Sequence, residues 1–513
     1  MWKDGAAKTF QLATRQAGVV IPIFGLIWWA YWAISESATS LHPDMTEAYV
    51  WGQEFQLGYW KHPPFWAWVC GAWFLVFPRS GVPFALLSAT NATIGLWGVW
   101  RLVGLFARGE KRVAATALFL LTPFPTFWAY KYNANSIFLS VWPWTLFFFV
   151  RAYERRRLVD SLGLGAMVAA ALLCKYYALI LCVTIGLAAL SRPERNAYFR
   201  SPSPYVSAAV AALLILPYLS WLWVNHAPPL GYLGSVSGLG TITTLYNIQK
   251  VFFGTLVELS VPAAIVLYYG RDRLRDLPRR ARARWADPTY RFLTILNFAP
   301  LGLTLAVGLA IQVKLDNYML AGAWVLAPLW MIETIEPRAT QPLARAATGL
   351  AVALSLGALV VSPLTPLYYT FTSGPGGDRR LSQSDLGYRE PRQELAEAAT
   401  QFWRSSTGLP LKYVAGSPRY SDGVAFYGPE RASDFAQFDL YRSRWVTREK
   451  IARDGLLAVC VASDDDCLAE TQRWSVAGAR TTTMQVSRRI FGQTKYAESF
   501  VVNAIPPQSS ATP

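Results

Sequence analysis

Charged residues are scarce in this chain of 513 residues. Only 16% of them are Asp, Glu, Lys or Arg, whereas 53% are hydrophobic and 14% are aromatic. A typical soluble domain has about 25% charged residues, so this composition argues against a soluble protein and indicates a polytopic membrane protein. The net charge of +16 would also suit a nucleic-acid partner. We expect none, because the basic residues lie between apolar stretches and do not form one patch.

Cysteine is rare as well, with five residues in the whole chain. Cys70, Cys174 and Cys182 lie in apolar segments and are expected to be small buried residues. Cys460 and Cys467 lie in a polar C-terminal region. They can form a disulfide if that region is outside the cytoplasm, and the sequence leaves this open.

Long apolar runs dominate the first 370 residues. The first run has no A-x-A-like cleavage site, so we interpret it as an anchor and not as a cleaved signal peptide. A spanning helix needs about 20 apolar residues. Eleven segments are candidates: 17–36, 82–104, 113–129, 136–152, 160–174, 177–191, 204–225, 251–270, 290–311, 317–334 and 346–366. The shorter apolar segment 63–77 begins with two prolines, which suit the first turn of a helix, and is interpreted as an interfacial helix.

Arginine clusters recur in alternate connections between these segments. They lie at residues 101–112, 151–157, 192–200 and 271–284. By the positive-inside rule these connections are cytoplasmic, as is the N-terminus. Eleven spans then place the region after residue 370 outside the cytoplasm.

The connections on the other side carry single lysines near the ends of the spans. These are Lys61, Lys131, Lys175, Lys250 and Lys314. An isolated ammonium group at that depth is costly unless it is paired. One such lysine is readily explained by snorkelling to the interface, but several on one side suit a lipid phosphate headgroup.

The first outer connection, residues 37–62, holds the densest set of reactive groups. Asp44 and Glu47 are three residues apart and would share one face of a helix. A carboxylate near a lysine stays ionised and can act as a general base or bind a metal. The alternative is that Asp44 caps a helix and Glu47 is a solvated loop residue.

Other polar groups follow in the later outer connections. The loop 129–136 offers Lys131, Tyr132, Asn133 and Asn135, whose amides suit sugar hydroxyls but are also common in turns. Lys175 and Tyr176 fall at a tight turn between two candidate spans. Lys314 and Tyr318 lie near the tenth span, where Lys314 can alternatively pair with Asp316.

The C-terminal part changes character. Residues 371–385 are polar and rich in glycine, which indicates a linker. Residues 386–513 alternate short apolar runs with polar segments and are expected to form a small α/β domain with a disordered tail.

The first outer connection resembles that of bacterial membrane glycosyltransferases of the GT-C fold, the group related to protein O-mannosyltransferases and the lipid A aminoarabinose transferase. The pattern D-x-x-E-A-Y followed by G-Y-x-K-H-P-P carries the resemblance, from Asp44 to Pro64, and Lys175-Tyr176 also matches. The resemblance covers residues 1–370. Many relatives have adjacent Asp and Glu in this loop, whereas here Thr46 precedes Glu47. Many also have an acidic residue where this chain has Asn133 and Asn135.

The resemblance implies a hexosyl or pentosyl transferase that uses a polyprenyl-phosphate sugar donor at the outer face of the bacterial inner membrane. Asp44, or secondly Glu47, would activate the acceptor hydroxyl. Fixed cations would stabilise the leaving phosphate. The residues expected to bind the donor phosphate are Lys61, Lys175, Tyr176 and Lys314. The residues expected to bind the substrate are Tyr59, His62, Lys131, Tyr132, Asn133, Asn135 and Tyr318.

The acceptor implied by the resemblance is a glycolipid, lipid A or lipopolysaccharide core. The sequence singles out no cofactor and leaves dependence on a divalent cation open. Two other functions remain open: a transporter or flippase of a lipid-linked sugar, and a protein O-glycosyltransferase. The transporter is disfavoured because the polar groups gather at one membrane face, without inverted repeats or ionisable residues in mid-span.

Overall fold

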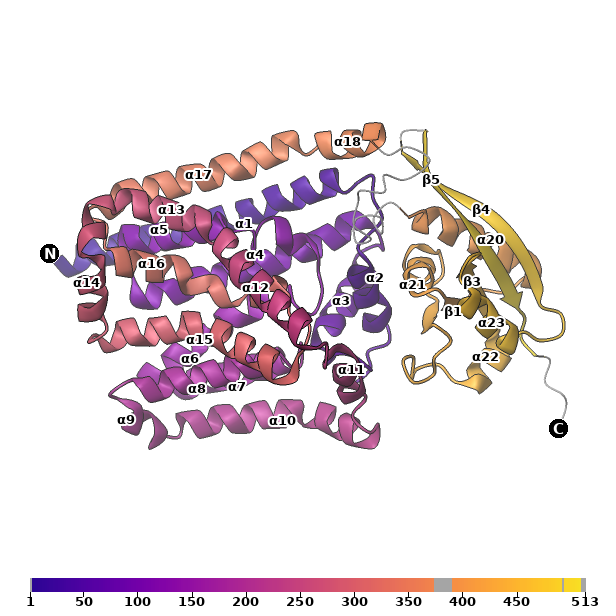
Figure 1. Cartoon of the computed structure of the whole chain (residues 1–513), viewed down its shortest axis with the longest axis horizontal. Helices are drawn as coiled ribbons and strands as arrows, with labels where there is room; N and C mark the ends of the chain where they lie inside the picture. Colours follow the sequence, from indigo (N-terminus) through magenta and orange to yellow (C-terminus); the bar gives the residue numbers. More distant parts are fainter. Residues whose placement is uncertain (1, 373–389, 491–492, 509–513) are drawn as a thin grey trace. The chain divides into compact units, whose positions relative to one another are not determined.

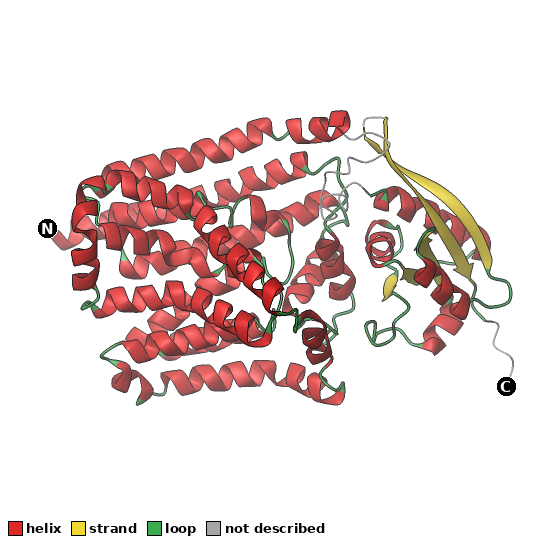
Figure 2. Ribbon diagram, viewed as in Figure 1, coloured by secondary structure: helices red, strands yellow, loops and turns green. Residues whose placement is uncertain are grey.

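The computed structural model describes residues 2–372, 390–490 and 493–508. Helices make up most of this part of the chain, and its strands all lie beyond residue 412 (Figure 2). The expected combination of an apolar helical region with a small C-terminal α/β domain is therefore confirmed. The predicted linker at 371–385 lies almost entirely outside the described residues. The end of the predicted tail, residues 509–513, lies outside them altogether.

The chain divides into two compact units. The first comprises Met1–Ala30, Lys61–Phe65 and Ser88–Leu359. The second comprises Tyr31–Trp60, Trp66–Leu87 and Val360–Pro513. Most of the first outer connection therefore belongs to the same unit as the C-terminal domain, while Lys61 and His62 belong to the other unit.

The first unit is built from helices, a few of which extend into the second unit at one end. They are α1 (Trp2–Ser35), α4 (Gly81–Phe106), α5 (Gly109–Leu120), η1 (Phe127–Tyr130), α6 (Phe138–Arg155), α7 (Leu158–Leu172), α8 (Ala178–Ser191), α9 (Arg195–Phe199), α10 (Ser203–Val224), α11 (Pro228–Val236), α12 (Thr241–Glu258), α13 (Ser260–Tyr269), η2 (Arg271–Asp276), α14 (Leu277–Arg284), α15 (Pro288–Ile311), η3 (Asn317–Leu320), η4 (Ala323–Leu326), α16 (Ala327–Ile335) and α17 (Thr340–Val361).

Five helices in the described part are long and apolar enough to cross a membrane. They are the apolar section Ala17–Ser35 of α1, and α4, α10, α15 and α17. The pair α12 and α13 would be a sixth, bent by 47°. The other predicted spans correspond to shorter helices such as α7 and α8, and the tenth begins with two 3-10 turns. A multi-pass membrane protein is thus supported, whereas the number of eleven spans stays a prediction.

The long helices of the first unit lie side by side (Figure 1). α7 packs against α6 and α10, α8 against α15, and α5 against α16. Large rings fill the spaces between the helices: Trp28, Trp142 and Trp324 are each at most 1% exposed. The arginine-bearing helices α9 and α14 lie at one end of this unit.

The second unit contains a five-stranded mixed sheet. Its elements are α2 (Pro43–Gly52), α3 (Phe65–Val76), α18 (Leu364–Thr372), α20 (Arg392–Thr407), β1 (Tyr413–Gly416), α21 (Pro418–Tyr427), β2 (Ser433–Ala436), α22 (Arg448–Asp454), β3 (Leu456–Val461), α23 (Asp465–Trp474), β4 (Arg480–Ile490) and β5 (Gln493–Ile505). The strand order is β2-β1-β3-β5-β4. β2, β1 and β3 are parallel, and β5 pairs antiparallel with β3 and β4.

A disulfide joins Cys460 on β3 to Cys467 on α23, with their Cα atoms 5.7 Å apart. The pairing that the sequence left open is therefore present in the structure. Cys70 and Cys174 are buried thiols, as expected, and Cys182 is half-buried.

Two glycines set the crossing of α2 and α3. A Cβ atom on Gly71 would overlap the backbone of Gly52, and one on Gly52 would overlap the backbone of Gly71 and Ala67. Only residues without a side chain allow this approach. A helix, α3, is thus observed where the interfacial helix 63–77 was expected, its interfacial position stays a prediction, and it packs against α2 at these glycines.

Candidate functional site

Asp44 and Glu47 lie on the first two turns of α2. Pro43 occupies the first helical position, where its missing N–H is harmless, and Asp44 follows it. An acidic residue in the first turn interacts favourably with the helix dipole. The N-cap is His42, so the alternative in which Asp44 caps the helix is wrong. The side chain of Asp44 is 38% exposed.

His42 fixes the start of this helix. Its Nδ1 accepts a hydrogen bond from the backbone N–H of Asp44 at 3.0 Å. A ring nitrogen that accepts a hydrogen bond carries no proton. The Asp44 carboxylate lies 3.7 Å from the same nitrogen, which therefore offers it no proton.

Glu47 lies near a buried pair of carboxyl groups in the C-terminal domain, Asp422 on α21 and Asp434 on β2. Burial raises the pKa of Asp434 to about 7, although a hydrogen bond from Ser421 lowers it. The pKa of Asp422 is raised well above its usual range by burial, then by Asp434 and by Glu47, while Arg392 opposes the shift. Burial therefore favours the neutral form of both carboxyl groups.

Aromatic stacking holds the end of the first outer connection. Tyr59 stacks on Trp51, with ring centroids 4.8 Å apart, and its hydroxyl donates to the carbonyl of Trp51 at 2.5 Å. Tyr59 is only 1% exposed. It therefore shapes the loop, and its hydroxyl is already engaged.

A cavity of about 170 Å³ adjoins α2 in the same unit. Its polar wall offers an amide, a carboxyl, a guanidinium and a hydroxyl group, and its other wall is apolar. The lining residues are Tyr49, Gln53, Glu54, Gly71, Phe74, Leu75, Arg431 and Ser433. Burial raises the pKa of Glu54, against a hydrogen bond with Ser433 and the charge of Lys450.

In the first unit, Lys175 and Asn135 are brought together from two predicted outer connections. The Nζ of Lys175 donates to Oδ1 of Asn135 at 2.7 Å. Lys175 lies in the turn between α7 and α8. The next residue, Tyr176, is hydrogen-bonded through its hydroxyl to that of Tyr218.

The loop after η1 also contacts Tyr318. The Tyr318 hydroxyl donates to the carbonyls of Trp128 and Lys131, at 2.7 and 2.8 Å, and the Lys131 Nζ lies 5.9 Å from the centre of its ring. Asn133 is buried, and its side chain accepts the N–H groups of Asn135 and Ser136, which is the structural role that turns often give to Asn. Tyr132 is 1% exposed.

Lys61 and His62 meet a residue that the sequence analysis did not single out. The Nζ of Lys61 lies 5.8 Å from the ring centre of Tyr232 on α11, and the His62 ring lies 5.9 Å from the same ring. Lys314 is exposed, and within the described residues its side chain forms no ion pair with Asp316. The Asp316 carboxylate instead accepts the N–H of Tyr318.

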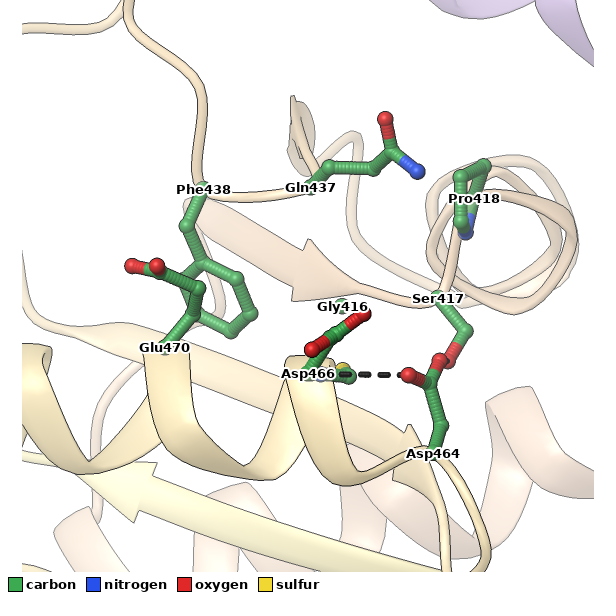
Figure 3. Close-up of a pocket in the computed structure, with 9 residues that line it drawn as sticks. Gly416, Ser417, Pro418, Gln437, Phe438, Asp464, Asp466 and Glu470 are labelled. Atoms are coloured by element: carbon green, nitrogen blue, oxygen red, sulfur yellow. Dashed lines mark hydrogen bonds between the residues drawn. The ribbon is translucent and has the colours of Figure 1, made fainter.

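No group of three or more His, Cys, Asp or Glu side chains in the described ranges is arranged to hold a metal ion. A second cavity, of about 180 Å³, lies where the parallel strands β1 and β3 end (Figure 3). Asp464 there accepts hydrogen bonds from the Ser417 hydroxyl and the Cys467 N–H. The sequence-predicted site residues take no part in this cavity.

Two contributions to the site were missed from the sequence. Arg392, Asp422 and Asp434 contact or influence α2 from more than 340 residues away, and nothing in their local sequence marks them. Tyr232 follows the pair Pro228-Pro229, with which α11 begins. This helix start was the sequence feature that could have drawn attention to Tyr232.

Residues 61–221 match the sequence model of the family described as dolichyl-phosphate-mannose-protein mannosyltransferase. A curated relative, the lipid A galacturonosyltransferase RgtD of Rhizobium johnstonii, is 22% identical over 435 residues, which is 78% of this chain and 87% of that protein. The crystal structure of ArnT from Cupriavidus metallidurans bound to undecaprenyl phosphate is similar to this one. The two align with a TM-score of 0.61 and 12% sequence identity, over 96% of this chain and 98% of that one. The structure of ArnT in the apo state aligns with a TM-score of 0.60 and 13% sequence identity, again over 96% of this chain and 98% of that one.

These comparisons confirm the resemblance to GT-C membrane glycosyltransferases. The structural likeness extends over almost the whole chain, including the C-terminal domain, whereas the family match covers the stretch that holds Lys61, Lys131 and Lys175 and stops short of Asp44 and Glu47. The type of sugar is not determined by them.

Proposed function

We propose that this chain, a membrane protein with the fold of GT-C glycosyltransferases, transfers one sugar from a polyprenyl-phosphate donor to an acceptor at the outer face of the bacterial inner membrane. The acceptor is lipid A or lipopolysaccharide core. The observation that carries the proposal is α2, which presents Asp44 and Glu47 on its first two turns, with Asp44 partly exposed and not used as the helix cap.

The reaction is a single displacement at the anomeric carbon. The acceptor hydroxyl oxygen forms a new bond to that carbon as the bond to the lipid phosphate breaks, so the configuration is inverted. The hydroxyl proton goes to a carboxylate, which we assign to Asp44 with Glu47 as the second candidate. The departing phosphate takes the electron pair and gains negative charge.

The lysines of the first unit are assigned to this phosphate. Lys175 is oriented by Asn135, and Lys61 is placed beside the ring of Tyr232. Fixed cations that meet charge as it develops lower the barrier, and removing one such contact typically costs about 3 kcal/mol, or roughly a hundredfold in rate. Lys131, Lys314, Tyr176 and Tyr318 are the further candidates for contacts with the donor.

The cavity beside α2 is assigned to a sugar of the acceptor. Its volume of about 170 Å³ suits one ring, and its mixture of an apolar wall with amide, carboxyl and guanidinium groups suits hydroxylated rings. Gln53, Glu54 and Arg431 would make the polar contacts. His62, Tyr132 and Asn133, which belong to the first unit, are the further candidates for substrate binding.

The names of the relatives support this choice of substrates. RgtD is a lipid A galacturonosyltransferase, and ArnT was solved with undecaprenyl phosphate. The topology that completes the proposal has eleven spans, a cytoplasmic N-terminus and a periplasmic C-terminal domain, because the arginine-rich connections would remain in the cytoplasm.

The test is mass spectrometry of lipid A and core from cells with the gene intact, deleted, or carrying Asp44→Asn. We expect one defined sugar mass to disappear in both mutants, which identifies the sugar as a hexose or a pentose. The control variant Glu470→Gln changes an exposed carboxylate paired with Arg473 and should keep the sugar. Unchanged envelope glycolipids would refute the glycolipid acceptor and point to a protein acceptor, and an accumulated, unflipped lipid-linked sugar would indicate a transporter.

A further inference from the structure

We infer that Arg392, the first residue of α20, is a positioning residue for the turn that carries Asp44 and Glu47. Through it, the C-terminal domain would hold the first outer connection in the geometry needed for transfer. This inference rests on the proposed function and adds a role for the C-terminal domain within it.

Arg392 spreads its guanidinium across the start of α2. Its Nη1 donates to the carbonyl of Leu41 at 2.6 Å, and its Nη2 donates to Oγ1 of Thr46 at 2.6 Å. Its Nε donates to the carbonyl of Arg419 at 2.7 Å. The guanidinium therefore binds the segment on both sides of Asp44, and its Nε is hydrogen-bonded to the C-terminal domain.

This arginine is completely buried, with 0% of its surface exposed. Burying a cation is costly unless hydrogen bonds and nearby charge compensate for it. Three neutral oxygen atoms supply the hydrogen bonds, and the nearby carboxyl group of Asp422 interacts favourably with the guanidinium, because Arg392 opposes the rise in the pKa of that group. A buried charge with such defined partners has one low-energy arrangement, which makes it a rigid support.

Further hydrogen bonds hold the same segment to the same domain. The Ser40 hydroxyl donates to the carbonyl of Glu390 at 2.8 Å, and the backbone N–H of Leu41 donates to the Tyr427 hydroxyl at 2.8 Å. These contacts fix residues 40 and 41, but Thr46 lies between Asp44 and Glu47 and is held by Arg392. The arginine therefore reaches the turn that carries Asp44 and Glu47.

Glu47 is linked electrostatically to the same cluster. Its charge raises the pKa values of both Asp422 and Asp434, whereas the positive charge of Arg392 lowers that of Asp422. Removing the guanidinium would abolish this interaction together with the hydrogen bonds to Leu41 and Thr46, so we expect α2 to shift. Arg392 thus acts on the carboxylates through position and charge, without touching the reacting atoms.

The test uses the full-length protein in detergent or nanodiscs, with Arg392→Lys, Arg392→Met and the milder Thr46→Val, which removes the accepting oxygen but keeps the side-chain shape. The matched control is Arg404→Met, on the same helix: Arg404 is 56% exposed and pairs with Glu430. Two readouts are taken: hydrogen–deuterium exchange of residues 41–50, and kcat and KM for the lipid-linked donor.

We expect Arg392→Met and Thr46→Val to speed exchange in 41–50 and to lower kcat by about tenfold or more, because small misplacements of reacting groups are costly. The donor KM should change little, and Arg392→Lys should restore part of kcat. Arg404→Met should match the wild type in both readouts. If Arg392→Met fails to fold, Thr46→Val and Arg392→Lys decide the question.

Unchanged exchange in the variants would refute the inference, as would faster exchange with an unchanged kcat. Failure of the proposed function is distinguished from these results, because it would show as a wild-type protein with no transferase activity. In that case the exchange data would still decide whether Arg392 holds α2.

Discussion

At the scale of single residues, charged groups occur in two different settings. In the second unit, carboxyl groups gather around α2, and two of them, Asp422 and Asp434, are buried together. In the first unit, three lysines of the predicted outer connections contact neutral groups: Lys175 an amide oxygen, and Lys61 and Lys131 aromatic rings. A neutral group does not offset the charge of a lysine, so these contacts are compatible with binding a phosphate.

Lys175→Gln is expected to impair use of the lipid-linked donor. The change removes one charge that we assign to the phosphate, so kcat/KM for the donor should fall roughly a hundredfold. Lys111→Gln is the control, because Lys111 pairs with Glu333 at 2.8 Å in an arginine-rich part of the first unit. Donor kinetics of Lys175→Gln equal to those of Lys111→Gln would remove Lys175 from the phosphate site.

The raised pKa of Asp434 predicts how stability depends on pH. Between about pH 4 and pH 7 the unfolded chain has lost this proton, whereas the folded protein retains it. Stability should therefore be highest below this range and should decrease as the pH rises towards 7, by at most about 1.4 kcal/mol per pH unit.

Thermal unfolding of Asp434→Asn, followed from pH 4 to pH 7, tests this expectation. The variant should show a weaker decrease of the melting temperature with pH than the wild type. Asp454→Asn is the control, because Arg453 and Lys412 lower the pKa of Asp454 and its titration falls below the range. If the melting temperature of Asp434→Asn decreased with pH as steeply as that of the wild type, the titration of another group would be responsible for the decrease.

At the scale of elements, the short helix α2 depends on its neighbours. It has ten residues, too few to be stable alone in water. α3 supports it through the crossing of Gly52 and Gly71, and the C-terminal domain supports it through α21, which packs against it. The position of Asp44 and Glu47 is therefore set by packing and not by helix propensity.

Gly71→Ala should displace α2 from α3, because the added methyl group would overlap the backbone of Gly52. We expect transferase activity to fall by about tenfold or more, together with a lower melting temperature. Gly81→Ala adds the same methyl group where nothing lies within 4 Å and should leave both unchanged. Full activity in Gly71→Ala would show that the crossing tolerates a wider spacing.

At the scale of the whole molecule, the arrangement of charge predicts orientation. The arginine-rich helix α14 should face the cytoplasm, and the disulfide-bonded C-terminal domain should face the periplasm, where disulfides persist.

Labelling with a membrane-impermeant maleimide on spheroplasts tests this orientation. Glu397→Cys on α20 should be labelled in intact spheroplasts, whereas Arg282→Cys on α14 should be labelled only after lysis. Both positions are exposed in the structure, and the unsubstituted protein measures the background from Cys182. The reverse pattern would invert the topology and place the proposed reaction on the other side of the membrane.

The sequence by itself determined the helical membrane class, the approximate place of the long apolar helices and the existence of a C-terminal α/β domain. These features follow from local patterns: apolar runs, arginine clusters and a change of composition near residue 370. The pattern from Asp44 to Pro64 likewise indicated the resemblance to GT-C enzymes. Each of these signals is contained in a short stretch of chain, so no distant contact is needed to detect it.

Only the tertiary structure decided which residues meet. It paired Lys175 with Asn135, placed Tyr232 beside Lys61, joined Cys460 to Cys467, and made His42, not Asp44, the cap of α2. It also brought Arg392 to Thr46 across 346 residues. A buried hydrogen bond between distant segments depends on how the whole chain packs, because each partner's local sequence is compatible with many other neighbours.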